Sequence, residues 1–293
     1  MQRILLLGVL LPVAASAMAM LLVTRLRRGG HPWTDRCGWE GALLAVIYAA
    51  VQLALDPWPG LPPGNIMQWP PFIAIAAAAA SLGAGERRPR LHRALLALVV
   101  AGAATTLLLL RPAALSSLAL YPALLWTALA VLCWLGLVAA WSGAGARTTP
   151  GAATTALAIT AGASAAAMLL FDSLTYAQHI GIIALIMAVL AVFAWSGRLA
   201  QAGSRSVARM LAVILPGWWI LSTTMSDLPR WGLPLLGLAG AASWLGAIPF
   251  VAALAPWKRT LLVGVLAALI VAPLMAWGVI QSLHQAQGHG DGY

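Results

Sequence analysis

The sequence contains very few charged residues, and this scarcity excludes most soluble folds. Of 293 residues, 8% are charged and 62% are hydrophobic. Uncharged stretches of about twenty residues recur along the whole chain, and each is long enough to cross the roughly 30 Å core of a bilayer as a helix. We therefore predict an all-α, polytopic helical integral membrane protein with short loops and no soluble domain.

Cysteines and catalytic signatures are equally scarce. The two cysteines, Cys37 and Cys133, indicate neither a disulfide framework nor a metal site, and we interpret both as packing residues. The sequence lacks the H-E-x-x-H, Walker and haem-attachment motifs, so we expect no metal, no cofactor and no catalytic residue. The GASA stretch at 162–165 has the Gly-x-Ser order of an intramembrane serine protease, but no histidine is expected at membrane depth to act as its base.

Apolar windows between charges and Pro/Gly clusters divide the chain into ten predicted membrane spans. The connections between them are all short, which leaves no room for a nucleotide-binding loop or an extended linker. The predicted spans are approximately 4–24, 37–55, 66–85, 94–110, 115–142, 151–171, 177–197, 207–226, 231–255 and 260–282.

The basic residues are distributed unevenly between the two sides of these spans. Only Arg3, Arg111 and Arg230 fall on one side. Because cytoplasmic loops carry an excess of Lys and Arg, the other side is expected to be cytoplasmic, with both termini outside the cell membrane. The residues on that basic side are Arg25, Arg27, Arg28, Arg36, Arg87, Arg88, Arg90, Arg93, Arg147, Arg198, Arg205, Arg209, Lys258 and Arg259.

The first twenty residues resemble a signal peptide, with Arg3, an apolar stretch and small residues at 15–17. Cleavage there would place Arg25 on the translocated side and invert every later loop, so we interpret the segment as the first span. Ten spans also allow two halves of five, 1–147 and 148–293, related as an inverted repeat. The similarity of ASAMAMLL (15–22) to ASAAAMLL (163–170) supports this division only weakly.

Acidic residues are absent from the middle of every predicted span. Glu40 comes closest, about one turn inside the second span, where Arg36 is expected to pair with it. Ion-coupled carriers place a carboxylate near the bilayer midplane in spite of its cost. Coupling through such a carboxylate is therefore disfavoured.

The polar stretch FDSLTYAQHIG (171–181) interrupts an apolar region and has two interpretations. In one, Thr175 and Gln178 form a capping box at the start of the seventh span, with His179 in its first turn near the interface. In the other, four side chains at helical spacing form one polar stripe that lines an external vestibule. The vestibule residues are Asp172, Thr175, Tyr176 and His179.

The sequence ILPGWWILSTTMSD places Pro216 and Gly217 in the middle of the eighth span. Proline has no amide hydrogen and crowds the preceding turn, so a kink is expected and the carbonyl near Ala212 should need a hydroxyl, a water or a ligand as its partner. The hydroxyl groups one turn later either satisfy freed carbonyls or line a polar path through the membrane. The predicted path residues are Pro216, Gly217, Ser222, Thr223 and Thr224.

Three functional classes follow from these observations. A permease or facilitator for a small solute is favoured by the short loops and the broken span. The alternative is a non-catalytic structural or accessory subunit of a membrane complex, favoured by the scarcity of buried polar groups, and an intramembrane enzyme is the third. The expected partners are anionic lipid headgroups at the Arg/Lys loops and other membrane subunits; nucleic acid is excluded because no soluble basic face is expected.

Overall fold

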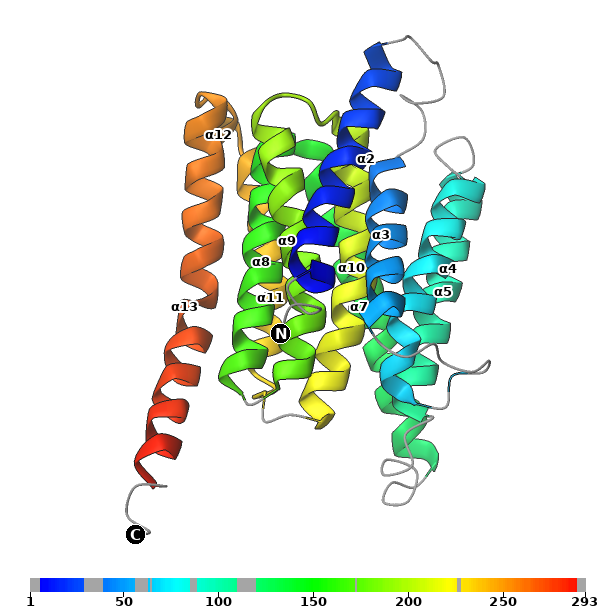
Figure 1. Cartoon of the computed structure of the whole chain (residues 1–293), viewed down its shortest axis with the longest axis vertical. Coiled ribbons are helices and arrows are strands. Elements are labelled where there is room, and N and C mark those ends of the chain that lie inside the picture. The colour runs from blue at the N-terminus through cyan, green and yellow to red at the C-terminus, as the bar shows by residue number, and fades with distance from the viewer. Residues whose placement is uncertain are drawn as a thin grey trace.

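The computed structural model of the chain describes residues 6–28, 39–55, 63, 65–84, 89–109, 120–171, 173–225 and 228–288. All regular secondary structure in these ranges is helical (Figure 1). The elements are η1 (Leu6–Leu10), α2 (Leu11–Arg28), α3 (Trp39–Leu55), η2 (Ile66–Gln68), α4 (Trp69–Ala84), α5 (Pro89–Leu109), α7 (Leu120–Arg147), α8 (Pro150–Leu170), α9 (Leu174–Trp195), α10 (Gln201–Met225), α11 (Gly232–Ala241), η3 (Ala242–Ala247), α12 (Pro249–Ala252) and α13 (Pro256–Gly288).

The lengths of these helices agree with a multi-pass membrane protein. Within the described residues, seven helices are long and apolar enough to cross a membrane: Leu6–Arg27, Arg90–Leu108, Leu124–Arg147, Pro150–Leu170, Leu174–Trp195, Gln201–Thr223 and Pro256–His284. Three shorter apolar helices cover Trp39–Leu55, Ile66–Ala80 and Gly232–Ala247. The all-helical prediction is therefore confirmed, while the number of ten spans and the two halves of five stay predictions.

The segment predicted as one span at 231–255 is divided in the structure. It contains α11, η3 and α12 in place of one continuous helix. Ile248 lies between η3 and α12 in an extended conformation, with φ −68° and ψ 133°. The residue before a proline is disfavoured in the helical region, and Pro249 follows Ile248 directly.

Several helices begin earlier than the sequence predicts, and in α5, α10 and α13 this places charged residues inside the helix. The spans were expected to begin at residues 94 and 207, whereas α5 begins at Pro89 and α10 begins at Gln201. A hydropathy window ends where arginines begin, but helical hydrogen bonding continues through them. Arg93 and Arg205, which lie outside the predicted spans, are therefore helical residues, and Arg209 lies one turn further along α10.

Helix α10 occupies the centre of the bundle (Figure 1). It packs against α3, α4, α5, α7, α8 and α9. In the most apolar 18-residue stretch of α10, 83% of the residues are buried. Helix α13 lies at the edge of the bundle and packs against α8, α11 and η3. The centre of the molecule is therefore a helix that contacts helices from both halves of the sequence.

Most of the described basic residues gather at one end of the bundle, which we call the basic end. The ends of α2, α7 and α9 and the beginnings of α5, α8, α10 and α13 meet there, at the top of Figure 1. Arg230 lies in the connection before α11, at the other end. The basic residues at the basic end are Arg25, Arg27, Arg90, Arg93, Arg147, Arg198, Arg205, Arg209, Lys258 and Arg259.

Close packing at the basic end depends on glycine. A methyl group added to Gly41 in α3 would lie 2.5 Å from the backbone oxygen of Ser206 in α10. A methyl group added to Gly203 in α10 would lie 2.5 Å from Oε1 of Glu40. The beginnings of α3 and α10 are thus in backbone contact, which any larger residue would prevent.

Glu40 is buried at this contact and pairs with a different arginine from the one predicted. Its carboxylate lies 2.5 Å from Nη2 of Arg27 in α2, and its side chain has no exposed area. The predicted partner, Arg36, lies outside the described residues. Glu40 lies at the N-terminus of α3, where the helix dipole also favours a carboxylate. Through its ion pair with Arg27 and its contact with Gly203, Glu40 connects α2 and α3 to the start of α10.

The outward surfaces of the peripheral helices are apolar. Leu132 in α7 is 68% exposed and Leu269 in α13 is 62% exposed. Cys133 is also exposed on α7, so its interpretation as a packing residue is wrong; Cys37 lies outside the described residues. An apolar outer surface is expected where helices face lipid.

Candidate functional site

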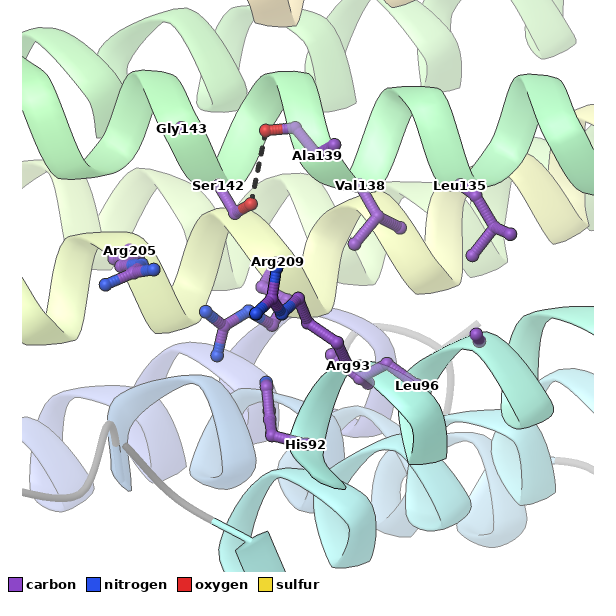
Figure 2. A pocket seen from close by; sticks show the side chains of 11 residues that line it. His92, Arg93, Leu96, Leu135, Val138, Ala139, Ser142, Gly143, Arg205 and Arg209 are labelled. Carbon is purple, nitrogen blue, oxygen red and sulfur yellow. Dashed lines mark hydrogen bonds between the residues drawn. The ribbon is translucent and has the colours of Figure 1, made fainter. Parts of the chain in front are cut away.

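A cavity lies between α5, α7 and α10 at the basic end, and we call it the basic pocket (Figure 2). Its volume of about 650 Å³ is within the range of pockets that bind small molecules. It was not predicted from the sequence. Its lining residues are His92, Arg93, Leu96, Ala97, Leu135, Val138, Ala139, Ser142, Gly143, Arg205 and Arg209.

Three arginines from two helices supply the charge of the basic pocket. Arg205 and Arg209 are four residues apart on α10 and therefore share one face of that helix. Figure 2 shows Arg93 of α5 extending toward Arg209, with Arg205 further along α10. Each arginine also takes part in a polar or electrostatic interaction within the protein. The pocket thus has a strongly positive wall.

His92 projects from α5 into the same region as Arg93 and Arg209 (Figure 2). The residue is 4% exposed, and neither ring nitrogen makes a hydrogen bond of normal geometry to another described residue, although the backbone of Ala80 lies nearby. A buried imidazole without such a bond is costly unless a ligand or water satisfies it. His92 is therefore a buried polar side chain of the pocket that the sequence did not single out.

The inner part of the basic pocket is apolar. Leu96 and Val138 are buried against each side of it, and Leu135 lies eight residues from Gly143 on α7, about 12 Å along the helix axis. The hydroxyl of Ser142 donates to the carbonyl of Ala139 at 3.3 Å, as the dashed line in Figure 2 marks. The pocket therefore combines a cationic mouth with an apolar interior.

The central part of α10 has a different environment, which begins at Pro216. Helix α10 continues through this proline, and the carbonyl of Ala212 accepts a hydrogen bond from Nε1 of Trp134 at 2.9 Å. This carbonyl is the one that the proline leaves without an amide partner. The structure supplies an indole from α7, where the sequence indicated a hydroxyl, a water or a ligand.

The remaining residues of the predicted polar path contact protein. The hydroxyl of Ser222 donates to the carbonyl of Trp219 at 2.9 Å, and the hydroxyl of Thr223 donates to the carbonyl of Ile220 at 3.0 Å. A methyl group added to Gly217 would be in ordinary contact with Leu107 and Trp134. These contacts account for the two hydroxyls by bonds within α10. The side chain of Thr224 lies outside the described part of the chain, and the polar path stays a prediction.

Four buried residues with ring side chains pack together at the second half of α10, and we call them the aromatic layer: Tyr48, Tyr176, His179 and Trp218. His179 stacks on Trp218 with ring centroids 5.0 Å apart and planes 16° apart. Tyr176 meets Trp218 edge to face at 5.8 Å, and Nε1 of Trp218 donates to the Tyr48 hydroxyl at 2.6 Å. All four rings are buried, so this layer fills the bundle between α3, α9 and α10.

His179 is fixed in the aromatic layer by Gln52 of α3. Nε2 of Gln52 lies 2.6 Å from Nδ1 of His179, and both residues are buried. Donation by the amide requires Nδ1 to be unprotonated, which places the ring hydrogen of a neutral His179 on Nε2. His179 therefore lies in the second turn of α9 and inside the bundle, in contrast to the interfacial first-turn position expected from the capping interpretation.

The structure separates the residues of the predicted vestibule. Ser173, not Thr175, is the N-cap of α9, and it makes no side-chain capping bond. The capping-box prediction is therefore wrong, because the helix begins at Leu174, two residues too early for Thr175 to cap it. Thr175 is exposed, whereas Tyr176 and His179 both contact Trp218. Asp172 lies outside the described residues, and the vestibule stays a prediction.

A second buried hydrogen-bond chain lies on the opposite side of α10. Nε1 of Trp219 donates to Oγ of Ser164 in α8 at 3.0 Å, and this hydroxyl donates to the carbonyl of Thr160 at 2.8 Å. Trp219 also meets Trp141 edge to face at 6.1 Å. Tryptophans of α10 therefore connect it to helices on both of its sides, which leaves few unsatisfied polar groups in the middle of the bundle.

The only trace of the basic pocket in the sequence is the spacing of its lining residues along each helix. Arg205 and Arg209 are four residues apart, as are His92 and Leu96. Such spacing does not show which helices face each other. Among the described residues, no group of three His, Cys, Asp or Glu side chains is arranged to hold a metal ion. The chemistry available in the pocket is therefore that of guanidinium, imidazole and hydroxyl groups.

No family model, curated protein or solved structure matches this chain. No function can therefore be assigned to this chain by similarity to another protein. The basic pocket and the packing of α10 are the observations from which a function can be argued.

Proposed function

We propose that the protein is a permease or facilitator that binds a small anionic solute in the basic pocket. In this proposal the chain crosses the cell membrane ten times, with the basic end in the cytoplasm and both termini outside, as the excess of arginine at that end favours. The observation that carries the proposal is the contrast along α10. A large pocket lies beside its first half, while buried aromatic rings surround its second half.

This contrast is the one expected of a carrier that is open toward the cytoplasm. Alternating access requires a binding site that communicates with one side of the membrane while the other side is closed. Arg209 and Pro216 are seven residues apart on α10, about 10 Å along the axis, so the pocket and the closed region adjoin each other. Opening to the outside would require Tyr48, Tyr176 and His179 to separate from Trp218.

Pro216 provides the place where α10 can bend during such a change. The Ala212 carbonyl is held by the Trp134 side chain and not by an amide of α10, so the helix has one backbone hydrogen bond fewer at this point. A side-chain bond can be broken and remade without unwinding the helix.

Since the predicted spans have no midplane carboxylate, we propose facilitated movement of the solute without coupling to protons through such a group.

Reconstitution into liposomes tests transport directly. Vesicles loaded with a panel of small organic carboxylates and phosphates should release at least one of them faster when they contain the protein. The double variant Arg205→Gln/Arg209→Gln should lose this flux, and Arg198→Gln, which changes an exposed arginine outside the pocket, should keep it. Flux that survives the double variant would exclude the pocket from the path, and protein-independent release of the whole panel would remove the transport proposal.

Thiol labelling tests alternating access without a known substrate. Ile180 is fully buried in α9 beside the aromatic layer, and Thr175, five residues earlier on the same helix, is exposed. In a background of Cys37→Ser and Cys133→Ala, a carrier should allow slow labelling of Ile180→Cys by an impermeant maleimide from outside. Rapid labelling of Thr175→Cys is the control. Complete protection of Ile180→Cys after Thr175→Cys has fully reacted would indicate a fixed, closed bundle.

A non-catalytic subunit of a membrane complex is the second candidate. The packing of Trp218 and Trp219 on both sides of α10 favours it, because the bundle centre resembles a rigid core. The labelling experiment separates the two candidates, since a rigid subunit has no outward-open state.

A further inference from the structure

We infer that the basic pocket takes a phosphate-bearing amphiphile, meaning a molecule with a phosphate group at one end and an apolar chain at the other. This inference names the substrate class of the proposed permease and so rests on that proposal for its role in transport. The binding itself rests on the geometry of the pocket alone.

The arginines favour phosphate over carboxylate. A guanidinium group is a planar fork of donors that matches two oxygens of a phosphate, and phosphate oxygens can accept from several forks at once. Arg93 and Arg209 approach each other from two helices, so one anion between them can contact both (Figure 2). A carboxylate has only two oxygens and a single charge to offer three guanidinium groups.

His92 provides an independent indication that a ligand belongs here. Its ring is almost completely buried, lines the pocket, and has no hydrogen bond of normal geometry with the described residues. An imidazole can donate to a phosphate oxygen from one nitrogen and accept from a phosphate hydroxyl at the other. A phosphate group beside Arg93 would therefore satisfy a buried polar side chain as well as the arginines.

The interior of the pocket indicates the second part of the ligand. Leu96, Leu135 and Val138 line the pocket beyond the arginines and would exclude a fully hydrated anion from that part. An apolar chain of a few carbon atoms would fill this space and gain from leaving water. Basic pockets between membrane helices are also where lipid headgroups bind, so the same chemistry can come from a phospholipid or from a soluble phosphate ester.

Calorimetric titration of the detergent-purified protein with hexyl phosphate tests the inference. Hexanoate and inorganic phosphate are the matched probes that remove the phosphate group and the apolar chain respectively. We expect hexyl phosphate to bind with at least tenfold higher affinity than either. Arg209→Gln and, as a milder change at an exposed position, Arg93→Gln should each lower its affinity at least tenfold. Arg198→Gln is the charge-matched control and should bind like the original protein.

Three results would overturn the inference. Hexanoate binding as tightly as hexyl phosphate would show that phosphate is not preferred. An equal loss of affinity in Arg198→Gln would show attraction to the basic surface as a whole. Unchanged affinity in a folded Arg93→Gln protein, judged by its thermal transition, would place the binding site elsewhere.

A competition experiment identifies the source of the ligand. The protein is placed in phosphatidylcholine nanodiscs with and without phosphatidic acid, and hexyl phosphate is then titrated. Weaker apparent binding in the presence of phosphatidic acid indicates that the lipid headgroup enters the pocket, and equal binding indicates a soluble ester; both support the phosphate assignment. Binding without flux in the liposome experiment would refute the permease while leaving the pocket assignment in place, and flux restricted to carboxylates would do the reverse.

Discussion

Nε1 of Trp134 donates a hydrogen bond to the carbonyl oxygen of Ala212 at 2.9 Å, four residues before Pro216. A proline inside a helix leaves this carbonyl without its amide partner, and inside a membrane no bulk water is present to replace it. An indole from α7 thus completes the hydrogen bonding of α10. The same contact connects the central helix to a helix that lines the basic pocket.

We predict that Trp134→Phe destabilises the protein by about 1–3 kcal/mol, because it leaves the Ala212 carbonyl buried and unsatisfied. Pro216→Ala restores an amide donor to this carbonyl, so the cost of Trp134→Phe should be smaller in the Pro216→Ala background. A double-mutant cycle of thermal or denaturant unfolding in detergent measures the difference. Equal costs in both backgrounds would mean that Trp134 contributes by filling space and not by its hydrogen bond.

A second pair of residues should show the same kind of coupling. Tyr48→Phe removes the hydroxyl that accepts from Nε1 of Trp218 at 2.6 Å and leaves a buried indole N–H without an acceptor. We expect Tyr48→Phe to cost about 1–3 kcal/mol. The double variant Tyr48→Phe/Trp218→Phe should cost less than the sum of the single variants, as measured by unfolding. Additive costs would argue against this hydrogen bond.

The sequence predicted the helical class because that class depends on hydropathy, which each segment carries by itself. It also identified Pro216 as a break in backbone hydrogen bonding, since the missing amide is a property of one residue. It could not supply the partner, because Trp134 precedes Ala212 by 78 residues and only the tertiary fold brings them together. His179 was misplaced for the same reason: its burial depends on Gln52, which is 127 residues away.

The basic pocket was missed for a different reason. Arginines at the margin of an apolar window are interpreted as loop charges, and Arg93, Arg205 and Arg209 were assigned in that way. The helices that carry Arg93 and Arg205 begin five or six residues earlier than predicted, and Arg209 lies one turn further along α10, so all three arginines line a cavity. A sequence pattern that tracks hydropathy alone cannot separate these two arrangements.

Replacement of a single glycine should disturb the contact between α3 and α10. In Gly41→Ala the new methyl group would lie 2.5 Å from the oxygen and 2.6 Å from the carbonyl carbon of Ser206, so the backbone of one helix must move. We expect a destabilisation of about 1–3 kcal/mol, typical of an overfilled contact. Gly102→Ala is the matched control, because a methyl group at this helical position meets nothing within 4 Å. It should be neutral or stabilise by about 0.5–1 kcal/mol, through the better helix propensity of alanine. Equal thermal transitions for the two variants would contradict the close contact.

The orientation of the bundle can be measured with two probes on one helix. Thr175 and Ser196 are exposed near opposite ends of α9 and are 21 residues apart, about 31 Å along the helix, which is enough to place them on opposite sides of a bilayer. Ser196 lies at the basic end, so the excess of arginine there predicts that it faces the cytoplasm. In the background of Cys37→Ser and Cys133→Ala, an impermeant maleimide added to intact cells should label Thr175→Cys at once. Ser196→Cys should be labelled only after the cells are permeabilised. Because both probes belong to the same helix, the reverse pattern would invert the whole bundle and place the basic pocket on the outside. Labelling of both positions in intact cells would show that α9 does not cross the membrane.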